Sequence, residues 1–145
     1  MMKQDKLVAA LRLYGASHVQ LTRAFADSLG LHSTDAAALS EIIYGEDRGS
    51  PTSPAELASK LAISKPALSA CINRLEEAGH IIRCRESSDR RVIALRCSPS
   101  IYQHVDKFFS PVSARMSKVV EELSEAEVDL IQRFLQLSSK AVSPN

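Results

Sequence analysis

The chain has 145 residues, of which 45% are hydrophobic and 24% are charged, the composition of an ordinary globular domain with a core of its own. Its 18 basic and 17 acidic residues give a net charge of +1, so overall charge offers no argument for a polyanionic partner. No apolar stretch approaches the roughly 20 residues that span a bilayer, and the amino terminus has no signal-peptide pattern. We therefore expect a single-domain cytoplasmic protein that does not bind membranes.

The sequence offers no catalytic or metal-binding constellation. It has no glycine-rich phosphate loop and no paired nucleophile and base, so we expect neither an enzyme nor a cofactor. The cysteines form no CxxC pair and are odd in number, which favours reduced, mostly buried thiols at Cys71, Cys84 and Cys97. A redox role for Cys71 stays open. No zinc site is expected because the histidines are scattered, at His18, His32, His80 and His104.

Two helices are predicted in the first third of the chain. Apolar or aromatic positions recur at spacings of three and four over residues 6–29, which places one stripe on a helix: Leu7, Leu11, Tyr14, His18, Leu21 and Phe25. A second helix is predicted over residues 35–44, with Thr34 as its N-cap and Gly45 at its end. The segment EDRGSPTS that follows is typical of a loop.

Two further helices and a hairpin are predicted in the middle of the chain. The run Ser53-Pro54-Ala55-Glu56 has the form of a complete capping box and opens a short helix. A second start follows at Ser64, and the helix that it opens ends near Gly79, with one apolar face: Leu68, Cys71, Ile72 and Leu75.

Beyond this helix the apolar period changes from helical to alternating, in HIIRCRE and RVIALRC around the turn SSDR. This pattern predicts a β-hairpin. Alternation should place Arg83 and Arg85 on one face and Ile82 and Cys84 on the other, with Cys84 buried. A turn centred near residue 88 would set Cys84 opposite Ile93.

Two amphipathic helices are predicted at the carboxyl end. Residues 101–123 carry a near-heptad apolar stripe, although Pro111 should kink or divide this helix. Ser124-Glu125-Ala126-Glu127 is another capping box, opening a last helix. With the first helix, these segments carry more apolar surface than one domain of this size easily covers, which favours packing between two subunits. Packing within one subunit is the alternative.

The order of short helix, turn, helix and hairpin is that of a winged helix-turn-helix, whose second helix enters the major groove of DNA. The outward face of this helix is small and polar, formed by Pro66, Ala67, Ser69, Ala70, Asn73 and Arg74. Ser69 and Asn73 suit base edges, and Arg74 suits a phosphate or guanine. Ser64 and Lys65 add a helix start that favours anions. An ordinary solvated helix face is the alternative.

Several arginines lie in and near the tip of the predicted hairpin. Five arginines lie between residues 83 and 96, against two acids. We expect Arg91 to enter a minor groove, Asp89 to orient it across the turn, and Arg90 to meet a phosphate. A merely solvated turn is the alternative.

The run from Ser53 to Leu95 resembles the MarR family of bacterial transcriptional regulators, specifically through residues 54–95, PAELASKLAISKPALSACINRLEEAGHIIRCRESSDRRVIAL. The resemblance lies in the ELA-type scaffold helix, in NRLEEAGHI at the end of the second helix, and in the Asp89-Arg90-Arg91 wing pattern. One departure is Leu95-Arg96-Cys97-Ser98-Pro99, where family members usually continue into a leucine-threonine pair and a glycine.

The resemblance implies a mainly α fold with a small β-hairpin: a winged helix-turn-helix with long N- and C-terminal dimerisation helices. We expect one domain, residues 1–145, with dimerisation helices at 1–30 and 99–140 and a DNA-binding lobe at 34–97 whose wing is 81–97. It further implies a homodimer on a pseudo-palindromic site in double-stranded DNA, often a repressor released by a small ligand or by oxidation. Ser53, at the start of the scaffold helix, joins the expected DNA contacts.

Family ligands usually lie between the dimerisation helices and the DNA-binding lobe. The polar-tipped side chains that suit such a crevice are Tyr14, His18, His32, Tyr44 and Tyr102, and ordinary packing is the alternative for each. The competing hypothesis for the whole chain is a winged-helix protein-interaction module without DNA binding. A large apolar patch on the exposed face of the second helix would favour that module.

Overall fold

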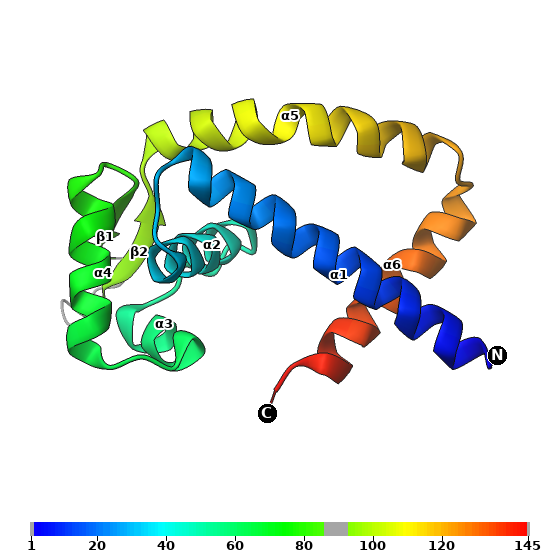
Figure 1. The fold of residues 1–145 in the computed structure, drawn as a ribbon, viewed down its shortest axis with the longest axis horizontal. Helices are drawn as coiled ribbons and strands as arrows, with labels where there is room; N and C mark the ends of the chain where they lie inside the picture. Colours follow the sequence, from blue (N-terminus) through cyan, green and yellow to red (C-terminus); the bar gives the residue numbers. More distant parts are fainter. Residues whose placement is uncertain (1, 86–92, 145) are drawn as a thin grey trace. The chain divides into compact units, whose positions relative to one another are not determined.

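The computed structural model describes residues 2–85 and 93–144 (Figure 1). The elements follow in the order α1 (Lys3–Ser28), α2 (Ser33–Asp47), α3 (Pro54–Leu61), α4 (Lys65–Glu77), β1 (Ile81–Cys84), β2 (Ala94–Cys97), α5 (Pro99–Glu121) and α6 (Glu125–Val142). The chain forms two compact units, Met1–Val105 and Asp106–Asn145. The predicted fold class, mainly α with a small hairpin, is confirmed. No helix within the described ranges is long and apolar enough to cross a membrane.

The core of the first unit is built by α2, α4 and the hairpin. Four side chains of α4 are buried on one face, as the sequence predicts: Leu68, Cys71, Ile72 and Leu75. They share the core with fully buried side chains of the neighbouring elements, namely Leu39, Ile42, Leu57, Ile81, Leu95 and Ile101. Each buried Leu or Ile contributes about 1.5–3 kcal/mol. This burial fixes which face of α4 is left to solvent.

The bounds of α2 differ from the predicted ones at both ends. His32 rather than Thr34 is the N-cap, so that prediction is wrong, and no side chain caps this end. Gly45 lies buried inside the helix instead of ending it. A Cβ on Gly45 would stand 3.1 Å from both the Ser50 carbonyl oxygen and the Thr52 amide nitrogen. The glycine therefore permits a close crossing of the 50–52 segment over α2.

The helix-turn-helix is held by side-chain caps at both of its starts. The Ser53 hydroxyl accepts the Glu56 amide at 3.2 Å, but the carboxylate of Glu56 accepts from the Thr52 hydroxyl at 3.4 Å, so the expected capping box is only half formed. The Ser64 hydroxyl accepts a first-turn amide of α4 at 3.2 Å. Between the helices Ala62 adopts a left-handed conformation with φ 52°, which makes the turn tight.

The strands β1 and β2 pair antiparallel, with Cys84 opposite Ala94. The predicted partner, Ile93, is therefore wrong by one residue. The predicted burial of Cys84 is also wrong, because Cys84 is only half-buried, and Ile82, predicted on the same face, is 42% exposed. The Leu95 amide donates to the Thr52 carbonyl at 2.9 Å. This bond ties the hairpin to the loop before α3.

The two last helices form without much burial. α5 continues through Pro111 as one helix, so the expected division does not occur. The capping box at the start of α6 is confirmed, because the Glu127 amide donates to the Ser124 hydroxyl at 3.2 Å and the Ser124 amide donates to the Glu127 carboxylate at 2.8 Å. No described residue from 106 to 144 is buried.

A bidentate ion pair joins α4 to α2. Arg74 donates from Nε and Nη2 to the two carboxylate oxygens of Asp35, at 2.9 and 2.8 Å. Asp35 is 3% exposed, and the Cys71 thiol also donates to it. The hydrogen bonds from Arg74 lower the pKa of Asp35 below 3.8 although burial acts in the opposite direction. The carboxylate is thus charged in the fold and holds α4 in place.

We expect Asp35→Ala to lower the free energy of unfolding by about 2 kcal/mol at neutral pH, because it removes a charged hydrogen-bond pair. The folded-state pKa is lowered, so the stabilisation is present above the ordinary pKa of 3.8 and is lost as the pH falls through the lower folded value. Urea unfolding at neutral and acidic pH should show the difference between wild type and variant shrinking in acid. The exposed Asp47→Ala control, on the same helix, should change stability by at most about 0.5 kcal/mol. A pH-independent difference would contradict this role of the carboxylate.

Candidate nucleic-acid interface

The exposed face of α4 is small and polar. All seven residues expected to point outward or to begin the helix are exposed: Lys65, Pro66, Ala67, Ser69, Ala70, Asn73 and Arg74. Within α4, which lies wholly in the described part of the chain, no large hydrophobic side chain is exposed. The apolar patch that would favour a protein-interaction module is therefore absent from this helix. Small side chains let the backbone approach a groove floor closely, and polar ones can read base edges.

The start of α4 combines a cap with free donors. The Ser64 side chain is exposed and accepts a backbone N–H, so its own O–H is left to donate. Lys65 follows at the first helical position, where a helix N-terminus attracts anions. Ser53 caps α3 in the same way but is half-buried.

The structure gives Arg74 a partner that the sequence did not predict. Its guanidinium is paired with Asp35, which lies 39 residues earlier in the chain, while its side chain stays 51% exposed. A guanidinium has five N–H donors, of which the two bonds to Asp35 use two, so this half-exposed side chain keeps donors that a phosphate could accept from. Arg74 thus first serves to hold α4 on α2.

The base of the wing also contacts α4. Arg83 of β1 donates from Nη2 to the side-chain oxygen of Asn73, Oδ1, at 2.7 Å. The Nε of Arg83 lies 3.9 Å from the Glu76 carboxylate. The strand pattern predicts a face for Arg83 but not its contact with Asn73. The one local indication of that contact is the short turn that joins α4 to β1. The expected wing contacts Asp89, Arg90 and Arg91 lie outside the described residues.

The buried thiols of Cys71 and Cys97 have raised pKa values. Burial raises the pKa of Cys71 to about 12, helped by its hydrogen bond to Asp35. Burial raises the pKa of Cys97 to about 12 as well. Both therefore stay protonated near neutral pH, whereas oxidants react with the thiolate. Among the described residues no three His, Cys, Asp or Glu side chains gather as a metal site.

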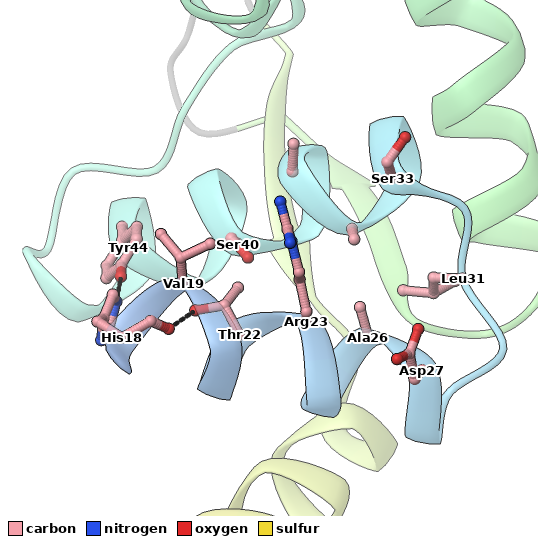
Figure 2. Close-up of a pocket in the computed structure, with 12 residues that line it drawn as sticks. His18, Val19, Thr22, Arg23, Ala26, Asp27, Leu31, Ser33, Ser40 and Tyr44 are labelled. Carbon is pink, nitrogen blue, oxygen red and sulfur yellow. Dashed lines mark hydrogen bonds between the residues drawn. The ribbon is translucent and has the colours of Figure 1, made fainter. Parts of the chain in front are cut away.

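A crevice of about 460 Å³ lies between α1 and α2 (Figure 2). Of the five side chains expected in a ligand crevice, His18 and Tyr44 line it, joined by a hydrogen bond of 2.9 Å between Nε2 and the phenol oxygen. Tyr14 stacks on His18 at 6.2 Å between ring centroids but does not line the crevice, and neither do His32 and Tyr102.

The wall of this crevice is otherwise mostly small and apolar, with Ala26, Leu31 and Ala37 among its residues. Two charged residues that sequence reasoning missed, Arg23 and Asp27, add polar groups to it. Nothing in the sequence indicates that these two residues line a crevice, because charged residues are common on the exposed face of any surface helix.

The sequence comparisons agree with this architecture. A model of the MarR family matches residues 29–92, which contain α2, α3, α4 and β1. An uncharacterised HTH-type transcriptional regulator of Bacillus subtilis (strain 168), YcgE, is 29% identical over 128 residues, 88% of this chain and 80% of the relative.

Solved structures share the fold. A mutant of MepR from a multidrug-resistant S. aureus clinical isolate superposes with a TM-score of 0.71 at 16% identity, covering 94% of this chain and 97% of that one. MepR in complex with DNA gives 0.54 at 17% identity, covering 91% and 96%. NadR in complex with 4-hydroxyphenylacetate gives 0.60 at 19% identity, covering 92% and 91%. With its winged helix-turn-helix, a family model that matches residues 29–92 and a regulator relative along most of its length, the chain is similar to the MarR family of transcriptional regulators.

Proposed function

We propose that this regulator is a homodimer that binds a pseudo-palindromic site in double-stranded DNA, represses transcription there, and is released by a small ligand. The observation that carries the DNA-binding part is the exposed face of α4, which has small and polar side chains and no exposed large hydrophobic one. A relative with the same fold, MepR, has been solved with DNA. A face of this composition fits a major groove better than an apolar protein partner.

The proposed contacts fall into three classes. Ser69 and Asn73 face base edges, with Pro66 and Ala70 small enough to allow close approach. Backbone phosphates are met by Ser64, Lys65 and Arg74 on α4, by Ser53 at the start of α3 and by Arg90 of the wing. Arg91, oriented by Asp89, is proposed to enter the minor groove.

The dimer part of the proposal rests on apolar surface that the chain leaves uncovered. None of the residues of α6 is buried, yet Leu130 is 58% exposed, Ile131 41%, Leu135 45% and Leu137 60%. A monomer rarely exposes such a stripe, and a second copy would cover it by isologous contact. We therefore assign dimerisation to residues 1–30 and 99–140 and DNA binding to residues 34–97.

A small ligand is proposed for the crevice between α1 and α2. Its wall is mainly apolar, with the hydrogen-bonded His18 and Tyr44 at one place and Arg23 at another. This combination of apolar wall and few polar groups is typical of small-molecule sites. NadR, which shares the fold, has been solved with 4-hydroxyphenylacetate. An aromatic carboxylate of that kind would meet an apolar wall and the cationic Arg23 in this crevice, which Asp27 also lines.

For DNA binding, Ser69→Glu should weaken affinity for a selected site by more than about tenfold, because it places a negative charge against the groove. The wild type should also weaken steeply as salt rises, since phosphate contacts release counterions. Selection from a randomised duplex pool followed by fluorescence anisotropy measures both. Ser59→Glu, the same substitution at an exposed position of α3 that is not among the proposed contacts, is the control and should bind as wild type. A wild type that enriches no sequence and is retained without salt sensitivity would favour the protein-interaction alternative.

For the dimer, Ile131→Arg combined with Leu135→Arg should yield a monomer of 15.8 kDa, because charges on one face of α6 oppose its burial. Sedimentation velocity gives the mass directly. Gln136→Arg, which adds a charge on a different, exposed face of the same helix, should leave the dimer intact. A wild type that sediments as a monomer at micromolar concentration would overturn the assignment.

For the ligand, wild type should bind 4-hydroxyphenylacetate in isothermal titration, and Ala37→Trp should abolish the binding by filling the crevice. Ala55→Trp, on the exposed side of α3, adds the same bulk elsewhere and should bind as wild type. Equal binding by all three proteins would place the ligand outside this crevice.

A further inference from the structure

The side chain of Asn73 is held by the wing. Arg83 donates from Nη2 to the side-chain oxygen of Asn73, Oδ1, at 2.7 Å. The Nε of Arg83 lies 3.9 Å from the carboxylate of Glu76, which is on α4 like Asn73. Asn73 and Glu76 are three residues apart, so they share a face of α4. The guanidinium of Arg83 therefore lies against both side chains at the edge of the exposed face.

This contact fixes which half of the amide is presented outward. A guanidinium has only donors, so the amide must turn its oxygen toward Arg83 and its NH₂ group away from it. An unconstrained asparagine in a major groove reads adenine by donating to N7 and accepting from N6 at once. With its oxygen engaged by a cation, Asn73 is left chiefly as a donor.

We propose that Arg83 is a positioning residue that makes Asn73 a donor-only reader, and that Asn73 thereby selects guanine rather than adenine. Guanine presents only acceptors at its purine edge in the major groove, O6 and N7, so both suit the amide NH₂ group, whereas adenine presents a donor, N6, that a donor-only amide cannot pair with. This inference rests on the proposed DNA-binding function. It adds a specificity determinant in which a wing residue, without touching a base, sets the preference of the helix.

The test is selection from a randomised duplex pool by wild type and four variants. Wild type should select guanine at one position of each half-site. Arg83→Ala frees the amide and should shift that position toward adenine by about tenfold, the size expected for a bidentate contact. Arg83→Lys keeps a donor-only cation and should retain guanine, whereas Asn73→Ala should lose the preference at that position alone. Arg85→Ala removes an equal charge from an exposed neighbour and should leave every position as in wild type.

The possible outcomes distinguish a failure of this inference from a failure of the proposed DNA-binding function. If wild type enriches no motif, the proposed function fails, and the inference fails with it. If wild type enriches a motif that Arg83→Ala and Asn73→Ala leave unchanged at every position, only the inference is overturned. A uniform loss of affinity in Arg83→Ala with unchanged base preference makes Arg83 a phosphate contact and also overturns it. Thermal unfolding of each variant verifies that it is folded, and Arg83→Lys and Asn73→Ala carry the test if Arg83→Ala is not.

Discussion

The buried carboxylate of Asp35 requires a cation, and Arg74 of α4 supplies it. A carboxylate that is 3% exposed is unfavourable unless it is paired and hydrogen-bonded, and both of its oxygens accept from one guanidinium. The planar fork of arginine fits this carboxylate in one orientation. The rotation of α4 about its axis is therefore set twice, by its apolar face and by this pair. Every residue of α4 that our proposal offers to DNA depends on that rotation.

The arginines near α4 are used mainly within the protein. Arg74 is paired with Asp35, and Arg83 is held between Asn73 and Glu76. The exposed face of the helix consequently presents short hydroxyl and amide groups more than free charge. In the proposed complex of this chain, whose net charge is +1, discrimination would therefore rest on hydrogen bonding at base edges, and Lys65 and the helix start would supply local attraction for phosphate.

The carboxyl-terminal unit differs from the first unit because none of its described residues is buried. Its helices satisfy their own backbone hydrogen bonds, and α6 is capped at its start by a reciprocal pair. They nevertheless leave apolar side chains such as Leu130 and Leu137 more than half exposed. Helix formation is local, but covering an apolar stripe needs a partner surface. This contrast within one unit is the physical basis for the proposed dimer.

Elements whose signals are local can be predicted from the sequence. Apolar spacing predicts α1, the buried face of α4 and the amphipathic α5 and α6. Ser53, Ser64 and Ser124 mark three helix starts, because a cap acts within three residues. The other features depend on contacts between residues that are distant in the chain. Gly45 lies inside α2 because the 50–52 segment crosses it closely, and the hairpin register is one residue from the predicted one. The partner of Arg74 lies 39 residues away, and a pairing across that distance depends on how the helices pack, which no local pattern records.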